Sequence, residues 1–151
     1  GCGCGIISIL AAKKDAIVTS TDINPIALRA LVENAKENNV TIDIIASDLF
    51  ENIEVKSFDF IIINPPYYPK NPSSMAENAW FCGENFEYFE SLFRQLPRFL
   101  TPSNSTLMIL SVDCELEKIK AIALQNKITF RVVQESKVMG ETNFIFILEL
   151  L

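Results

Sequence analysis

The chain has 151 residues, of which 49% are hydrophobic and 21% are charged, as expected for one globular domain with a sizeable core. The formal net charge of -6 argues against a broad basic surface for nucleic acid, although a local basic patch is compatible with it. The sequence contains no histidine, which excludes every mechanism that needs an imidazole base, including a Ser-His-Asp triad. No apolar stretch reaches the roughly 20 residues that span a bilayer and no signal-peptide pattern opens the chain, so we expect a cytoplasmic protein without membrane association.

The four cysteines are spread along the chain without the paired CxxC spacing of a zinc site or a disulfide framework. They are Cys2, Cys4, Cys82 and Cys114. We therefore expect reduced thiols and no metal site.

Hydrophobic periodicity predicts strands and helices that alternate along the chain. Asn24 and Pro25, as N-cap and first-turn proline, mark the start of one helix. The run FDFIII reads as a strand buried on both faces that ends abruptly at Asn64. The predicted helices are residues 6–13, 25–38, 84–100 and 115–125, and the predicted strands are residues 16–21, 41–46, 58–63, 106–112, 129–135 and 143–150.

This order of elements predicts an α/β fold with a doubly wound, mostly parallel sheet and helices on both faces. The last two strands, joined by KVMGET with Gly140 at the turn, are expected to form a C-terminal antiparallel hairpin at one edge. We expect residues 1–151 to be a single domain. Helical spacing also predicts that an aromatic stripe belongs to the core, namely Phe86, Tyr88, Phe89, Phe93 and Phe99.

Polar residues follow three of the predicted strands at their carboxyl ends: Asp22, Asp48 and Asn64. In open α/β sheets the ligand lies outside this edge of the sheet. We therefore expect the three side chains to converge on one ligand site.

A glycine cluster, Gly1, Gly3 and Gly5, stands directly ahead of the first predicted helix, where glycine lets the backbone pass close to a bound molecule. The spacing is GxGxG rather than GxGxxG, which argues mildly against a dinucleotide. Asp22 is placed to accept both hydroxyls of a ribose. Alternatively, it caps the helix that begins near Asn24.

Asp48 could accept a hydrogen bond from the exocyclic amine of an adenine, with Ile23 and Leu49 contacting the faces of the ring. When Asp48 is considered alone, a solvated loop acid explains it equally well. Its assignment therefore depends on the other motifs.

The segment Asn64-Pro65-Pro66-Tyr67 supplies acceptors in a stiff frame, because each proline fixes its own φ angle. The side-chain carbonyl of Asn64 and the backbone carbonyl of Pro65 suit the two hydrogens of a planar –NH2 group. Accepting both hydrogens favours a pyramidal nitrogen, whose lone pair can then attack an electrophile without a strong base. Tyr67 can stack on the planar substrate, and the competing interpretation is a simple strand-ending turn.

In this order and spacing, the motifs resemble class I S-adenosylmethionine-dependent methyltransferases of the NPPY branch, which includes the methyltransferase small domain. GCGCG resembles the glycine loop of that family, TDINPIAL its ribose-binding acid with the following helix, SDLF its adenine-contacting segment, and NPPY its signature for planar nitrogen. The resemblance covers residues 1 to about 68 and implies a Rossmann-like methyltransferase sheet with S-adenosylmethionine as cofactor. It implies that the catalytic residues are Asn64, Pro65 and Tyr67, and that the cofactor-binding residues are Gly1, Gly3, Gly5, Asp22, Ile23, Asp48, Leu49 and Asn64.

Within that branch, the SDLF and NPPY pair, the GEN at residues 83–85 and the closing GETNFIFILEL are similar to glutamine-N5 methyltransferases that act on release factors. A protein glutamine is therefore the expected target. RNA methyltransferases of the small-domain type share NPPY, so an RNA or DNA base stays open as the target, as does a need for an activator subunit. Two alternatives belong to other functional classes. One is a non-catalytic binding module. The other is a nicotinamide-dependent oxidoreductase, which is favoured only by the glycine loop.

One departure from the family concerns the start of the chain. The family places a strand at the centre of the sheet, ending in an acidic residue two positions before the first glycine, whereas this chain begins on Gly1. We therefore expect that the first central strand is missing and that residues 1–151 are an N-terminally incomplete methyltransferase domain.

Overall fold

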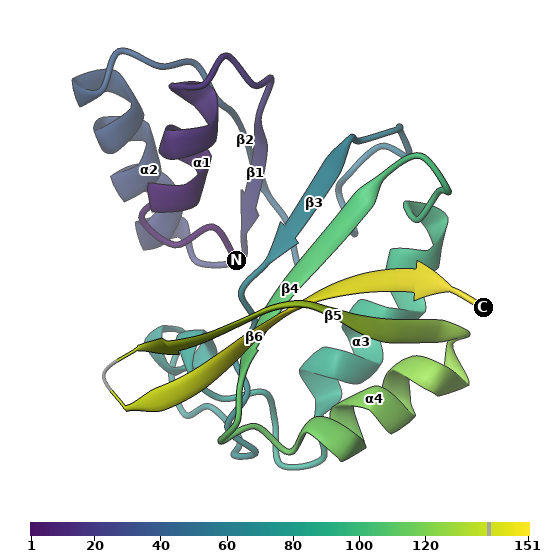
Figure 1. Cartoon of the computed structure of the whole chain (residues 1–151). Helices are drawn as coiled ribbons and strands as arrows, with labels where there is room; N and C mark the ends of the chain where they lie inside the picture. Colours follow the sequence, from purple (N-terminus) through teal and green to yellow (C-terminus); the bar gives the residue numbers. More distant parts are fainter. Residues whose placement is uncertain (139) are drawn as a thin grey trace. The chain divides into compact units, whose positions relative to one another are not determined.

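A computed structural model describes residues 1–138 and 140–151 of the chain, in two compact units (Figure 1). The first unit is Gly1–Glu54 and the second is Val55–Leu151. Each unit has a β-sheet of its own. Within the described residues, no helix combines the length and the apolar character needed to cross a membrane.

In the first unit, two parallel strands are connected through a helix, as parallel pairing requires. The pairing sets Asp22 at the end of one strand opposite Ala46 at the end of the other. The elements are α1 (Ile6–Ala12), β1 (Thr19–Asp22), α2 (Pro25–Glu37) and β2 (Asp43–Ala46). Each overlaps its predicted range, and both strands begin later than predicted.

The start of α2 is fixed by the residues that predicted it. Asn24 has an extended backbone, and its side-chain oxygen accepts a hydrogen bond from the N–H of Ile26 at 2.9 Å. Pro25 occupies the first turn, where its missing N–H leaves no hydrogen bond unmade. The predicted N-cap is confirmed.

The second unit contains a four-stranded mixed sheet in the order β3-β4-β6-β5 (Figure 1). The pairing of β3 with β4 is parallel, whereas β6 is antiparallel to both β4 and β5. The strands are β3 (Phe60–Ile63), β4 (Ser105–Ser111), β5 (Ile128–Val138) and β6 (Glu141–Leu150), and the helices are η1 (Ala76–Ala79), α3 (Glu87–Gln95), η2 (Leu96–Arg98) and α4 (Leu116–Gln125).

The α/β class and the C-terminal hairpin are confirmed, but the prediction of a mostly parallel sheet is wrong. The chain reverses at Gly140, whose φ of +93° favours glycine, and β6 then inserts between β4 and β5. Both pairings of β6 are therefore antiparallel, and the sheet of this unit is mixed. The other residues of the predicted turn include Met139, which lies outside the described residues.

Both α-helices of the second unit pack on the same face of its sheet. Phe93 of α3 meets Phe130 of β5 edge to face at 5.9 Å between ring centroids, and Phe130 lies 5.3 Å from Phe146 of β6. The amine of Lys120 in α4 lies 5.9 Å from the ring centre of the same Phe146. Within this unit the helices thus cover one face, and the predicted helices on the other face of the sheet stay a prediction.

The aromatic stripe is core, as predicted, although Tyr88 is only half-buried. The helix itself is shorter than predicted, because Pro97 has no N–H to donate to the preceding turn and the chain continues as η2. The stripe residues with 1% or less of their surface exposed are Phe86, Phe89, Phe93 and Phe99.

Strand β3 is buried on one face, which corrects the prediction that both faces are buried. Ile61 and Ile63 are 9% exposed, whereas Phe60 is 65% and Ile62 is 49% exposed. The strand lies at the edge of its sheet, and exposed and buried residues alternate along it.

Gly5 joins the glycine cluster to α1 with a φ of +88°, and a Cβ atom there would overlap the side chain of Leu31, which is fully buried in α2. Gly5→Ala should lower the free energy of unfolding by about 2–4 kcal/mol, since left-handed strain and overpacking add. Urea denaturation followed by circular dichroism measures the loss. The control is Gly3→Ala, which has a φ of +54° but nothing within 4 Å of its Cβ and should lose only about 1–2 kcal/mol. Equal losses in the two variants would contradict the packing argument.

Candidate active site

Asp22 is a buried carboxylate at the end of β1, with 7% of its surface exposed. Its Oδ2 accepts a hydrogen bond from the N–H of Gly3 at 2.8 Å, and its Oδ1 accepts one from the N–H of Asn24 at 2.9 Å. Its backbone carbonyl accepts from the N–H of Ser47, which follows β2, at 3.1 Å. Asn24, not Asp22, caps α2. The Asp22 carboxylate instead connects the glycine cluster to Asn24, and the Asp22 main-chain carbonyl connects the end of β1 to the residue after β2.

The glycine cluster runs along the end of β1 and is fixed there by main-chain hydrogen bonds. The N–H of Cys2 donates to the carbonyl of Thr21 at 2.7 Å, and the N–H of Gly5 donates to the carbonyl of Cys2 at 3.0 Å. A Cβ atom on Gly1 would lie 3.9 Å from Oδ2 of Asp22. The structure thus brings the predicted glycines and Asp22 together.

The turn after β2 carries the predicted adenine-contacting residues. Asp48 is exposed and Leu49 is half-buried with a left-handed φ of 51°. Two residues that the sequence reading missed fix this turn: the hydroxyl of buried Ser47 accepts from the N–H of Asn52 at 3.0 Å, and the Asn52 side chain donates to the carbonyl of Ala46 at 2.8 Å. The short polar side chains of SDLFEN were the available signal.

Asp22 ends β1 and Asp48 comes two residues after the neighbouring parallel strand β2, so both stand at the same edge of the first sheet, as predicted. Ile23 lies beside Asp22 and is 46% exposed, which leaves an apolar side chain available for contact. A buried carboxylate, a close-running glycine backbone and exposed apolar neighbours fit an adenosine, with its hydroxyls and apolar ring faces. Asn64 belongs to the second unit, so its convergence with these residues stays a prediction.

The NPPY segment leaves β3 and forms part of a pocket of about 130 Å³ in the second unit. Asn64 is exposed, Pro65 is buried and Tyr67 is half-buried. The pocket therefore contains all the predicted catalytic residues. Its lining residues are Asn64, Pro65, Pro66, Tyr67, Tyr68, Ala79 and Trp80.

Tyr67 and Tyr68 lie against each other, with 4.8 Å between ring centroids and 52° between ring planes. Burial raises the pKa of Tyr67 to about 12, with a further contribution from its hydrogen bond with Tyr68. Tyr67 therefore stays a neutral phenol at physiological pH.

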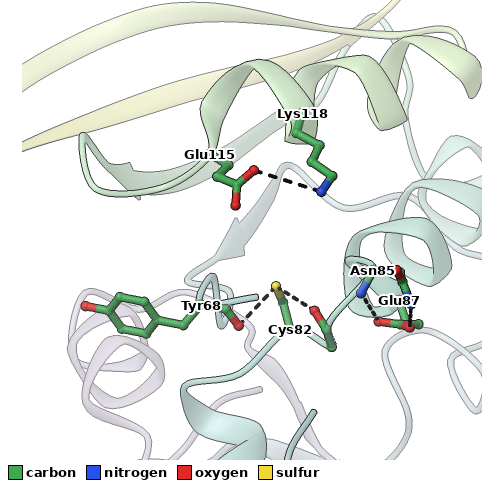
Figure 2. A network of polar contacts seen from close by, with 7 residues as sticks. Tyr68, Cys82, Asn85, Glu87, Glu115 and Lys118 are labelled. Atoms are coloured by element: carbon green, nitrogen blue, oxygen red, sulfur yellow. Dashed lines mark hydrogen bonds and ion pairs between the residues drawn. The ribbon is translucent and has the colours of Figure 1, made fainter. Parts of the chain in front are cut away.

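After a loop, the chain comes back alongside the NPPY segment. Tyr68 and Phe81 form an isolated parallel β-bridge between the two segments. The N–H of Tyr68 donates to the carbonyl of Trp80 at 3.1 Å, and the N–H of Cys82 donates to the carbonyl of Tyr68 at 2.9 Å. Figure 2 shows the thiol of Cys82 donating to the same Tyr68 carbonyl, at 3.4 Å. Burial raises the pKa of Cys82 to about 11, so this thiol stays protonated and structural.

Gly83 and Asn85 set the start of α3. A Cβ on Gly83, whose φ is +89°, would overlap the carboxylate of Glu87. That carboxylate accepts from the main-chain N–H of Asn85 at 3.0 Å and from its side-chain amide at 3.1 Å (Figure 2). Main-chain N–H groups and the Asn85 side chain also lower the pKa of Glu87. The left-handed φ and the contact with Glu87 thus favour a glycine at position 83.

Comparison with known proteins identifies relatives of both sequence and fold. A family model described as the methyltransferase small domain matches residues 1–82. A protein from Methanocaldococcus jannaschii, provisionally named a protein N5-glutamine methyltransferase, is 42% identical over 106 residues, which are 66% of this chain and 53% of that protein. The ribosomal RNA small subunit methyltransferase C of Haemophilus influenzae is 41% identical over 70 residues, 45% of this chain and 21% of that protein. The chain thus spans about half, or less, of the length of these curated relatives.

Solved structures share the fold at lower identity. A methyltransferase from Pyrococcus furiosus has a TM-score of 0.74 and 20% identity over 100% of this chain and 73% of its own. In E. cuniculi, a two-protein complex responsible for methylation of the eRF1 translation termination factor includes a chain with a TM-score of 0.66 and 20% identity, over 99% of this chain and 81% of its own.

The family model covers more than half of the 151-residue chain, and its range includes the glycine cluster, Asp22, the SDLF turn and the NPPY segment. The family and the S-adenosylmethionine cofactor predicted from the sequence are confirmed by this match. The chain belongs to the methyltransferase small domain family of class I S-adenosylmethionine-dependent methyltransferases.

Proposed function

We propose that the chain acts in an N-methyltransferase whose target is the side-chain amide nitrogen of a protein glutamine, in a release factor. The observation that supports the proposal is the NPPY pocket of about 130 Å³, whose lining includes Asn64 and Pro65, the two residues proposed to supply acceptors for a planar –NH2. Pockets for drug-sized ligands measure about 300–1,000 Å³, so this one suits a single side chain. The 42% identity with the Methanocaldococcus jannaschii protein supports a glutamine as that side chain.

In the first unit, the residues around Asp22 would hold the cofactor. Each oxygen of an ionised carboxylate offers about two acceptor positions. One position on each Asp22 oxygen is taken by the N–H of Gly3 or Asn24, so one remains on each for a ribose hydroxyl. Ile23 and Leu49 would contact the adenine, and the exposed Asp48 would accept from its amine. Bound S-adenosylmethionine supplies an electrophilic methyl group on a sulfonium.

In the second unit, Asn64 and Pro65 would act on the target nitrogen. Their carbonyls accept the two amide hydrogens and favour the pyramidal geometry in which the lone pair is free to react. Tyr67 would pack on the amide plane as a neutral ring. This division of labour needs no histidine, in agreement with the sequence.

A second candidate target is the exocyclic amine of an RNA base. The 41% identity with the Haemophilus influenzae ribosomal RNA methyltransferase favours testing it, because the same acceptors suit that amine. The net charge of -6 argues for protein instead. The E. cuniculi complex supports including an activator subunit among the partners to be tested.

Asp22→Ala should weaken binding of S-adenosylhomocysteine roughly ten- to hundredfold, because each charge-assisted hydrogen bond contributes about 1.5–3 kcal/mol. Calorimetric titration measures the affinity. Because the variant also loses the bonds to Gly3 and Asn24, the 2′-deoxy form of the ligand serves as the control. The wild type should bind the 2′-deoxy ligand more weakly than S-adenosylhomocysteine. The variant should bind the two ligands with equal affinity. The same penalty for the deoxy ligand in both proteins would show that Asp22 only fixes the main chain.

Asn64→Ala should lower kcat by about 10²–10³ while leaving cofactor affinity nearly intact, the effect expected when one preorganised polar group is lost. Asn64→Asp keeps an acceptor at the same place and should fall between alanine and the wild type. Methyl transfer is measured with a glutamine-containing peptide from a release factor and, in parallel, with bulk RNA.

Near-normal turnover of the alanine variant would remove Asn64 from the mechanism. Transfer to RNA but not to the peptide would replace glutamine by a base as the target. Cofactor binding without transfer to either substrate would favour a non-catalytic binding module.

A further inference from the structure

One wall of the NPPY pocket comes from a residue outside the motif. Trp80 lines the pocket together with Asn64, Pro65 and Tyr67, and it is the only tryptophan in the sequence. With 63% of its surface exposed, it is a large apolar side chain that the core does not use. Tryptophan is enriched among the side chains that anchor a binding partner, and Trp80 stands at the edge of a pocket.

The main chain of Trp80 is bonded directly to the residue that follows NPPY. Its carbonyl accepts from the N–H of Tyr68 at 3.1 Å, and its own N–H donates to the carbonyl of Glu77 at 3.0 Å. The pairing continues as the N–H of Cys82 donates to the carbonyl of Tyr68 at 2.9 Å. The position of the Trp80 backbone beside the motif is therefore set before any ligand binds.

The loop between these paired segments is fastened at its base and inside its turn. At the base, Asn71 accepts from the N–H of Glu84 at 3.1 Å and donates its amide to the Glu84 carboxylate at 3.2 Å. Inside the loop, the carboxylate of Glu77 accepts from the N–H and the hydroxyl of Ser73 at 2.7 and 2.8 Å. A wall held in this way loses little freedom when a ligand contacts it, which favours affinity.

The chemistry of the pocket leaves one part of a glutamine side chain without a partner. The acceptors of Asn64 and Pro65 match the amide hydrogens, but they offer nothing to the two methylene groups that carry the amide. An indole ring provides a broad apolar surface with few rotatable bonds, and it suits such a stem. Trp80 has the largest side chain among the residues that line the pocket, and 63% of its surface is exposed.

We propose that Trp80 is a specificity-determining residue that packs on the aliphatic stem of the target glutamine and holds its amide at Asn64. This inference rests on the proposed function, because it assigns the glutamine to the same pocket. Trp80 contributes to substrate binding and takes no part in proton or methyl transfer.

Trp80→Ala should raise the KM for the release-factor peptide on the order of tenfold, the effect of losing an aromatic anchor, with kcat nearly unchanged. Trp80→Phe should restore most of the affinity, because it keeps an aromatic face. Met75→Ala is the matched control, since Met75 is 46% exposed in the same loop but does not line the pocket. All the variants should melt near the wild-type temperature. An unchanged KM in Trp80→Ala would overturn the proposal.

The single tryptophan also provides a readout in the wild-type chain that does not depend on turnover. Its fluorescence should change and saturate on titration with the glutamine peptide, and it should not respond to the same peptide with alanine in place of glutamine. Methylation of the peptide without a fluorescence change would overturn the role of Trp80 and leave the proposed function standing. A glutamine-specific fluorescence change without methylation would support contact between Trp80 and the glutamine, and it would overturn the proposed function. A response to RNA but not to the peptide would overturn both assignments to glutamine.

Discussion

The buried carboxylate of Asp22 is the interaction on which the first unit depends. A charge with 7% exposure is stable in a folded protein only when hydrogen bonds replace the lost water, and here main-chain N–H groups of Gly3 and Asn24 do so. Satisfying this one charge fixes the path of the glycine cluster, the end of β1 and the approach to α2. Gly5 then allows α1 to pack against Leu31 at a distance that no side chain at position 5 would permit. The arrangement that would bind a cofactor is thus also the arrangement that holds this unit together.

In the second unit, the main chain holds the NPPY segment in a fixed position beyond the end of β3. Pro65 and Pro66 restrict the backbone where β3 ends, and Tyr68 then bonds to the returning segment at Trp80. The pocket is therefore made from two pieces of chain that are both fixed by main-chain bonds. The aromatic core of α3 lies immediately beyond and anchors the returning segment, since Phe86 and Phe89 are fully buried.

The parts of the fold that the sequence predicted are those set by local residues. Asn24 with Pro25 starts α2, helical spacing of phenylalanines marks the buried face of α3, and the glycine at position 140 marks the hairpin. The insertion of β6 between β4 and β5 could not be predicted from the sequence of β6 alone, because a strand with these apolar residues can pair with either a parallel or an antiparallel neighbour. Trp80 was missed for a similar reason. Its place in the pocket depends on a hydrogen bond to Tyr68, and the polar sequence between the two gives no sign of it.

The lining of the NPPY pocket has a consequence for which side chains it admits. Among the lining residues that the structure describes, there is no Asp, Glu, Lys or Arg, and the phenol of Tyr67, with a pKa of about 12, stays uncharged. A lysine ammonium in this pocket would meet carbonyl acceptors but no carboxylate among the lining residues. A neutral amide needs no carboxylate, because carbonyl acceptors suffice for its hydrogens. If the proposed function holds, the absence of a carboxylate among the described lining residues would favour a neutral amide over a lysine on the basis of charge as well as of shape.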